Sequence, residues 1–225
     1  MAASLVNRNL KYKDKIKIVH IEAGLRSFDN SMPEEINRKL IDQMSDILFP
    51  PTKIDFNNLK KDNCLKSKKT FIVGNTITDV LKKYLPLAKK STILEKLKLK
   101  KKKYFLVTLH RPESVDIKKN LSSLIKTLKV LYKKYNYPII FPIHPRTKNN
   151  VKKLNLSFDK NIKIIEPLEY LDFLKLMNNS KLILSDSGGI QEEASILGVP
   201  CVTLRTTTER QITLLRNVNI MAGYN

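Results

Sequence analysis

A short stretch near the carboxyl end of the chain, SDSGGIQEEASILGVP (185–200), combines residue types that could hold a phosphate and a sugar. Gly188 and Gly189 have no side chain to keep an anion away from the backbone N–H groups that begin a helix. Ser187 can cap that helix or donate a hydrogen bond to a phosphate. Glu192 or Glu193, one turn farther along, can complement the helix dipole or accept both hydroxyls of a ribose. The stretch therefore predicts either an ordinary strand–turn–helix or a nucleotide site.

Other reactive side chains follow predicted strands elsewhere in the chain. Ligands of doubly wound sheets bind beyond the carboxyl ends of the strands, so these side chains are candidates for the same site. The glycine turn lacks the spacing of a dinucleotide fingerprint and the lysine of a P-loop, which argues against both chemistries. The side chains at predicted strand ends are Glu22, His110 with Arg111, His144 with Arg146, Asp186 with Ser187, and Arg205.

The elements that must position these residues alternate between short apolar runs and segments of helical periodicity. This alternation is typical of parallel α/β sheets. The clearest helix is MPEEINRKLIDQM, because Pro33 suits its first position and Glu34 and Glu35 suit its positive end. The lysine-rich stretch 89–103 interrupts the alternation and is the best candidate for a linker. We predict an α/β fold of two Rossmann-like domains with parallel sheets, residues 1–90 and residues 91–225.

The composition limits the class of protein. Hydrophobic residues make up 42% of the 225, enough for a core, and no apolar run approaches the length of a membrane span. The net charge is +21, but lysine supplies 34 of the 42 basic residues, in diffuse runs without interleaved aromatics. This pattern favours a solvated surface over nucleic-acid binding. The two cysteines and three histidines are not spaced for a metal site or a disulfide framework. We expect a cytoplasmic protein that binds no metal, nucleic acid or membrane.

Seven motifs occur in order along essentially the whole chain: HIEAGLRS, MPEEINR, GNTITD, TLHRPES, EPLEYLDF, SDSGGIQEEASILGVP and LRTTTER. Together they resemble the non-hydrolysing UDP-N-acetylglucosamine 2-epimerases. The resemblance implies a glycosyltransferase-B-like (GT-B-like) fold with the substrate between two domains, and a homodimer. It also implies interconversion of UDP-GlcNAc and UDP-ManNAc, with neither a cofactor nor a metal.

The resemblance assigns roles position by position. Glu22 and Glu34 match the catalytic carboxylates of the family, and His110 matches the active-site histidine near the diphosphate. Leu168 falls where the backbone holds the uracil, and Phe173 where an aromatic ring does. The other matches are the diphosphate-binding turn (Ser187, Gly188 and Gly189), the ribose-binding glutamate (Glu193) and an arginine beside the phosphates (Arg205).

The implied reaction expels UDP by anti elimination to a 2-acetamidoglucal and then adds UDP back to the other face. Departure of UDP needs fixed positive charge and hydrogen-bond donors at the diphosphate. Removal and return of the proton at C2 need carboxylates in a closed, drier site. The residue types at the matching positions suit both requirements.

The chain also departs from the family pattern. Family members begin with a strand and a GxRPE-type loop, followed by a GDT motif whose aspartate is a third catalytic carboxylate, and they end with closing helices. None of these features is found in this sequence. We therefore expect a chain shortened at both ends, with an incomplete and poorly stable first domain and little epimerase activity alone. PIHPRT also differs from the bacterial pattern, which puts the allosteric substrate site of bacterial relatives in doubt.

Two alternative functions are also compatible with the sequence. A GT-B glycosyltransferase would share the nucleotide-binding turn and the ribose glutamate, but HIEAGLR and PEE supply acid–base groups that simple transfer does not need. A non-enzymatic polyanion-binding module rests on net charge alone, and it predicts salt-sensitive binding to arbitrary nucleic acid.

Overall fold

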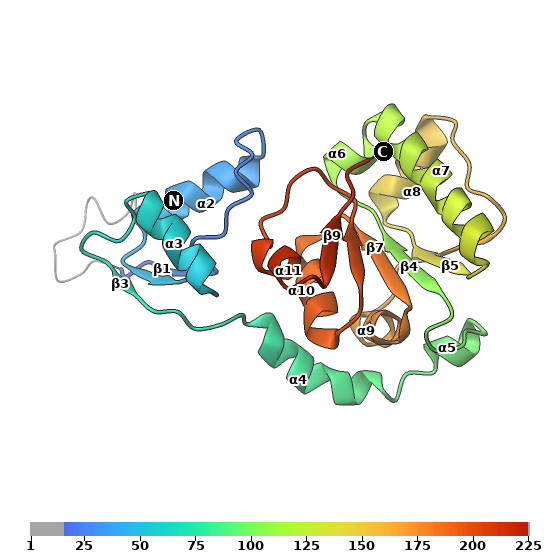
Figure 1. Ribbon diagram of the computed structural model, residues 1–225, viewed down its shortest axis with the longest axis horizontal. Coiled ribbons are helices and arrows are strands. Elements are labelled where there is room, and N and C mark those ends of the chain that lie inside the picture. Colours follow the sequence, from blue (N-terminus) through green and yellow to red (C-terminus); the bar gives the residue numbers. More distant parts are fainter. Residues whose placement is uncertain (1–15, 225) are drawn as a thin grey trace. The chain divides into compact units, whose positions relative to one another are not determined.

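The computed structural model describes residues 16–224, which form two compact units (Figure 1). The first unit consists of residues 16–76 and 207–212, and the second of residues 77–206 and 213–224. Residues 1–15 of the predicted first domain and residue 225 of the second lie outside the described residues.

The first unit is built on a parallel sheet with strand order β1–β2–β3. Helix α2 begins at Pro33, as predicted, and connects the first two strands. Helix α3 is capped by Thr52, whose side chain and that of Asp55 form a reciprocal capping box. Leu48 and Leu59 are fully buried between sheet and helix. The elements are β1 (Val19–Ile21), α2 (Pro33–Met44), β2 (Ile47–Phe49), α3 (Lys53–Lys61) and β3 (Lys69–Thr70).

The second unit is built on a six-stranded parallel sheet with strand order β6–β5–β4–β7–β8–β9. Most of its strands are short and apolar. The strands at the centre of the sheet are largely buried on both faces, as in a doubly wound sheet. The strands are β4 (Phe105–Thr108), β5 (Ile139–Pro142), β6 (Ile162–Ile165), β7 (Leu182–Ser185), β8 (Cys201–Thr203) and β9 (Asn219–Met221).

Helices cover both faces of this six-stranded sheet (Figure 1). Successive residues of a strand point to opposite faces, so Phe105 packs with the α7–α8 layer and Leu106 with the α4–α9–α10 layer. The α/β class and the parallel sheets predicted from the sequence are confirmed. The helices are α4 (Ile77–Ala88), α5 (Ile93–Lys96), α6 (Pro112–Val115), α7 (Lys118–Tyr135), α8 (Pro145–Lys153), α9 (Tyr170–Asn179), α10 (Gly188–Leu197) and α11 (Gln211–Leu215).

The boundary between the units differs from the predicted one. Helix α4 was assigned to the first domain, but it packs on α9 and α10 of the second unit. The predicted linker 89–103 is also part of the second unit, because Ile93 and Leu94 of α5 are buried in its core. The surrounding lysines conceal these two anchors in the sequence.

Two further properties concern the whole described chain. Between residues 16 and 224, no helix is both long and apolar enough to cross a membrane. Cys64 and Cys201 are free thiols, and both are buried.

Candidate active site

The carboxyl edge of the six-stranded sheet collects three of the predicted phosphate-binding elements. His110 follows β4, the Ser187–Gly189 turn follows β7, and Arg205 follows β8. These three strands are parallel neighbours, so the residues after them emerge at one edge of the sheet. This edge is where doubly wound sheets bind their ligands.

His110 is held by a buried carboxylate. Asp186 is fully buried, and its Oδ2 accepts hydrogen bonds from the backbone N–H groups of His110 (2.9 Å) and Arg111 (2.8 Å). Its Oδ1 lies 3.2 Å from Nδ1 of His110, within ion-pair distance. Burial opposes ionisation of Asp186, but these contacts outweigh it and hold the pKa of the carboxyl below its usual value. The His110 side chain is 38% exposed, so its ring remains accessible.

The glycine turn leads directly into α10 and leaves its first N–H groups approachable. Ser187 has the extended backbone of an N-cap residue, but its side chain makes no capping hydrogen bond. The hydroxyl is therefore not used by the helix. Gly189 is exposed, and a Cβ added there would meet nothing closer than Ser187 Oγ at 4.0 Å. The turn therefore keeps the hydroxyl and the backbone N–H groups that a phosphate would use, as the nucleotide-site interpretation requires.

Arg205 brings a guanidinium to the same edge. Its side chain is 1% exposed, and its Nε lies 3.9 Å from Oε1 of Glu113, the second residue of α6. Tyr224 is close to this group as well. Burial raises the pKa of the Tyr224 hydroxyl; the charges of Glu113 and Asp186 add to this rise, and that of Arg205 opposes it. Neither Glu113 nor Tyr224 was among the predicted site residues, although Glu113 lies within the TLHRPES motif.

Glu193, the predicted ribose ligand, is buried at the centre of α10 and has a specific partner. It is 7% exposed and accepts a hydrogen bond of 2.8 Å from the Tyr170 hydroxyl. Burial raises the pKa of the Glu193 carboxyl, and the Tyr170 hydrogen bond opposes that rise. Tyr170 in turn packs edge-on against Tyr84, with ring centroids 5.8 Å apart. Tyr170 was not among the predicted site residues, although it lies within the EPLEYLDF motif.

The predicted uracil residues lie where β6 leads into α9. Leu168 precedes the helix and Phe173 lies in its first turn. Both are half-buried and pack against the core on the α4–α9–α10 side of the sheet. Nearby, a pocket of about 420 Å³ is lined by Val80, Tyr84, Glu169, Tyr170 and Leu171.

Replacing Tyr170 by phenylalanine is expected to weaken UDP binding at acid pH. A glutamate must be ionised to accept both ribose hydroxyls, and its affinity for them falls as pH drops through its pKa. Because burial has already raised that pKa and the tyrosine opposes the rise, the acid loss of affinity should begin at a higher pH in the variant. Calorimetric titration of UDP from pH 5 to 8 measures this shift. In Glu193→Gln this pH-dependent loss of UDP affinity should be absent. If the loss begins at the same pH in Tyr170→Phe as in the unchanged protein, the assignment of Glu193 as the ribose ligand is contradicted.

The first unit carries the predicted catalytic carboxylates. Glu22 immediately follows β1 and has φ of 67°, a left-handed conformation uncommon for a residue other than glycine, asparagine or aspartate. Its Oε2 lies 3.2 Å from Nη2 of Arg210, and its side chain is 35% exposed. Strained backbone of this kind clusters at functional sites, which supports Glu22 as a candidate.

Helix α2 fixes the loop that follows Glu22, which we term the 22–28 loop. At the far end of this loop, the fully buried carboxylate of Glu35 accepts hydrogen bonds from Ser27 N (2.9 Å), Ser27 Oγ (3.0 Å) and Phe28 N (3.2 Å). Glu35 also pairs with Arg38 at 3.1 Å. Glu34, the predicted catalytic residue, is exposed in the first turn of the same helix. The two neighbouring glutamates therefore have different surroundings.

The near end of the 22–28 loop is organised by Asp42, near the end of α2. Its fully buried carboxylate lies 2.6 Å from His20 Nδ1 and 2.6 Å from Arg26 Nη2, and accepts the Gly24 N–H at 3.2 Å. Gly24 cannot be replaced easily, since its φ is 81° and a Cβ would lie 2.2 Å from the carbonyl oxygen of Asp55. One helix thus clamps the loop at both ends.

Replacing Glu35 by glutamine is expected to destabilise the first unit, whereas Glu34→Gln should not. The first change weakens several charge-assisted hydrogen bonds in a buried site and should cost about 2–3 kcal/mol. The second alters an exposed helix residue and should stay within about 0.5 kcal/mol. Hydrogen-exchange protection of the Ser27 and Phe28 amides measures both, since these amides donate directly to Glu35. Equal protection in the two variants would contradict this division of roles.

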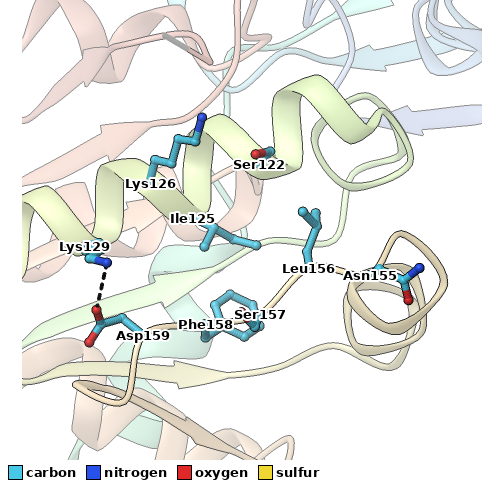
Figure 2. A pocket seen from close by; sticks show the side chains of 9 residues that line it. All are labelled: Ser122, Ile125, Lys126, Lys129, Asn155, Leu156, Ser157, Phe158 and Asp159. Carbon is cyan, nitrogen blue, oxygen red and sulfur yellow. Dashed lines mark ion pairs between the residues drawn. The ribbon is translucent and has the colours of Figure 1, made fainter.

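A separate pocket of about 470 Å³ lies between α7 and the loop before β6 (Figure 2). Ile125, Leu156 and Phe158 point into it, and Lys129 pairs with Asp159 at 3.5 Å. The loop precedes β6, so it lies toward the amino ends of the strands, away from the edge that carries His110. None of the predicted site residues lines this pocket, and we assign it no ligand. Among residues 16–224, no cluster of three or more His, Cys, Asp or Glu side chains is placed to hold a metal.

Comparison with known proteins gives concordant matches. A family model for UDP-N-acetylglucosamine 2-epimerase matches residues 4–225. The UDP-N-acetylglucosamine 2-epimerase of Methanocaldococcus jannaschii is 48% identical, over all of this chain and 62% of that protein. Its counterpart in Methanococcus maripaludis is 51% identical, over 92% of this chain and 58% of its own length.

Solved structures agree with these matches. The crystal structure of the M. jannaschii UDP-GlcNAc 2-epimerase with UDP-GlcNAc and UDP has a TM-score of 0.88 and covers 99% of this chain and 61% of that one. The Neisseria meningitidis enzyme bound to UDP-GlcNAc has a TM-score of 0.83 at 37% identity, over all of this chain and 61% of that one. The chain thus spans about three fifths of the length of the relatives it matches. By sequence and by fold, it belongs to the UDP-N-acetylglucosamine 2-epimerase family.

Proposed function

We propose that this chain takes part in the interconversion of UDP-GlcNAc and UDP-ManNAc, with UDP bound by the second unit. The observation that carries the proposal is the gathering of His110, the Ser187–Gly189 turn and Arg205 at one edge of the six-stranded sheet. Together they offer backbone N–H groups, a hydroxyl, an imidazole and a guanidinium, which suit a diphosphate. The named relatives crystallised with UDP-GlcNAc or UDP support the same substrate class.

The proposed reaction begins with loss of the proton at C2 to a carboxylate. The electron pair forms the C1–C2 double bond, the C1–O bond breaks, and UDP leaves with the bonding electrons. His110, Arg205 and the N–H groups of Gly188 and Gly189 stabilise the negative charge that develops on the diphosphate. In the return step UDP bonds again to C1, and C2 receives a proton on its opposite face.

The proton-transfer roles belong in this proposal to Glu22 and Glu34 of the first unit. Glu22 has the stronger structural support, since its backbone is strained and an arginine lies at its carboxylate. Glu34 is exposed, as a group that must meet a substrate can be, whereas Glu35 is fully engaged by the 22–28 loop. We propose Glu193 as the ribose ligand, with Leu168 and Phe173 holding the uracil.

Incubation of UDP-GlcNAc with the chain in D₂O tests the proposal. Because little epimerase activity is expected from this chain alone, the expected result is slow exchange of the C2 proton for deuterium, with weak UDP-ManNAc signals in the ¹H NMR spectrum. A GT-B glycosyltransferase, the alternative, has no reason to exchange the C2 proton. Binding of UDP without any exchange at C2 on prolonged incubation would therefore remove the proton-transfer roles proposed for this chain and retain only its nucleotide site.

We further propose that the chain acts in the cytoplasm as a homodimer, without nucleic-acid or membrane partners. The free, buried thiols are consistent with a reducing compartment, and burial raises the pKa of Cys201 to about 12, which keeps it unreactive. Light scattering should give twice the chain mass of 26.0 kDa. Salt-sensitive binding to arbitrary DNA would instead favour the polyanion-binding alternative.

A further inference from the structure

Asp186 is a fully buried carboxylate in direct contact with a predicted catalytic residue 76 positions away. One oxygen accepts two backbone N–H groups, which fixes where the His110 backbone leaves β4. The other oxygen faces Nδ1 of the His110 ring at 3.2 Å. The carboxylate therefore acts on both the backbone and the side chain of the same histidine.

Oδ1 is buried and makes no hydrogen bond among the described residues, although Nδ1 of His110 lies 3.2 Å away. An ionised carboxylate can only accept hydrogen bonds, so a proton on Nδ1 would provide the donor that this oxygen lacks. The contacts that hold the pKa of Asp186 below its usual value keep it ionised at neutral pH. The tautomer of neutral His110 that satisfies Asp186 is the one with its proton on Nδ1, and it leaves Nε2 for a ligand. When an anion is present at Nε2, a second proton there gives an imidazolium between two negative charges, which is electrostatically favourable.

We propose that Asp186 is a positioning residue that directs Nδ1–H of His110 toward itself and thereby presents Nε2 as a charged donor to the diphosphate. This inference rests on the proposed function for the identity of the anion. The arrangement is the one that a carboxylate provides to a catalytic histidine in other enzymes, where it sets the tautomer and stabilises the imidazolium. It gives Asp186 of the SDSGG motif a role separate from that of the glycines beside it.

The neighbouring histidine offers a contrast within the same sheet edge. His144 follows β5, and its ring centroid lies 5.6 Å from that of His110. Its Nδ1 accepts the backbone N–H of Arg146 at 3.2 Å and so caps α8. Nδ1 is thus an acceptor in His144 and, under this proposal, a donor in His110. The two rings should show opposite neutral tautomers.

The first test reads the tautomers directly from ¹⁵N NMR of histidine-labelled protein. The chain has three histidines, so signals can be assigned with His110→Gln and His144→Gln. Without ligand, neutral His110 should be protonated at Nδ1, and with UDP both ring nitrogens should be protonated. In Asp186→Asn, the amide can keep the two backbone hydrogen bonds, but its NH₂ would face Nδ1 and shift the neutral ring to the Nε2–H form. A wild-type ring protonated at Nε2 alone would overturn the proposal without any variant.

The second test is a double-mutant cycle on UDP affinity, measured by calorimetry. Asp186→Asn should weaken UDP binding roughly tenfold, as expected for loss of a charge-assisted hydrogen bond. In a His110→Gln background, the same substitution should have no further effect, because Asp186 acts through His110. If the two substitutions weaken UDP binding independently, so that their fold-changes in affinity multiply in the double variant, the proposal is overturned. Asp159→Asn, which alters the ion pair of Asp159 with Lys129 away from this edge of the sheet, is the control and should leave UDP affinity unchanged.

The two tests separate this inference from the proposed function. If the wild-type chain binds no UDP, the nucleotide assignment fails, but the tautomer of ligand-free His110 still decides whether Asp186 positions it. If UDP binds and the tautomer is the same with aspartate and asparagine at position 186, the positioning role fails and the nucleotide site stands.

Discussion

Replacing Asp42 by alanine is expected to lower the unfolding free energy of the first unit by about 3–5 kcal/mol, the usual cost of removing one partner of a buried ion pair. Asp42 is fully buried, and its carboxylate faces both His20 and Arg26 at 2.6 Å. Without it the Arg26 guanidinium, which is 1% exposed, retains Asp62 at 2.8 Å as its charged partner among the described residues. The Gly24 N–H would lose its acceptor as well.

This loss is comparable with the whole stability of a small domain, so the 22–28 loop should lose its fixed conformation. The two units need not unfold together, so a single melting temperature is a poor measure. Hydrogen exchange at Ala23, whose N–H donates to the Phe49 carbonyl at 3.3 Å, reports the first unit specifically. Exchange should accelerate strongly in Asp42→Ala.

Asp62→Ala is the matched control, because it removes the other carboxylate of the same arginine. The Asp62 side chain is 35% exposed, so water can replace much of what is lost. Its effect should be clearly smaller than that of Asp42→Ala. If the two variants have equal effects, Asp42 is not the organising group of the loop.

The strand ends of the second unit were predictable because they depend on local properties of the sequence. Short apolar runs between helical segments determine where strands stop, and a parallel sheet puts those stops at one edge. His110 and Arg205 could therefore be assigned to that edge from the sequence, and the helix beginning at Pro33 could be placed from its proline and glutamates. These inferences required no knowledge of which side chains touch.

Contacts between distant residues could not be predicted in this way. The pairing of Asp186 with His110 spans 76 residues, and that of Tyr170 with Glu193 spans 23. Glu34 and Glu35 both suit a helix start, and only the packing of the 22–28 loop on α2 makes Glu35 the buried one. The sequence gives the residue types of the site, whereas tertiary packing decides their partners.

The predicted linker shows the same limit for domain boundaries. Fifteen residues rich in lysine have the composition of a solvated connection, but a segment is anchored by its few apolar residues. Ile93 and Leu94 are 5% and 4% exposed, and they pack with Leu174 and Leu176 of α9. Together with the partly buried Leu97 and Leu99, they make this stretch part of the second unit.

Replacing Glu22 by glutamine is expected to reduce C2 proton exchange in UDP-GlcNAc by about 10²–10⁴-fold, the typical contribution of a general base. Glutamine has nearly the same shape but cannot accept the proton at neutral pH. UDP affinity should remain unchanged, because the proposed UDP ligands all belong to the second unit. The D₂O assay gives the exchange rate, and calorimetry gives the affinity.

Glu193→Gln is the reciprocal control. It should weaken UDP binding, while exchange at saturating substrate should fall less than in Glu22→Gln, because the proton-transfer group is intact. If Glu22→Gln lowers affinity and exchange equally, Glu22 binds the nucleotide rather than moving a proton.

A third variant separates strain from chemistry at the same position. Glu22→Gly should adopt φ of 67° without the cost of about 1–2 kcal/mol that a side chain incurs there, although it also loses the contact with Arg210. The protection of the first unit's backbone amides from hydrogen exchange should therefore be kept or increased, while exchange of the C2 proton of UDP-GlcNAc is lost. Such an opposition between stability and activity is expected where a residue is held in an unfavourable conformation for the reaction it performs. If Glu22→Gly instead destabilises the unit, the carboxylate at this position is chiefly a structural partner of Arg210.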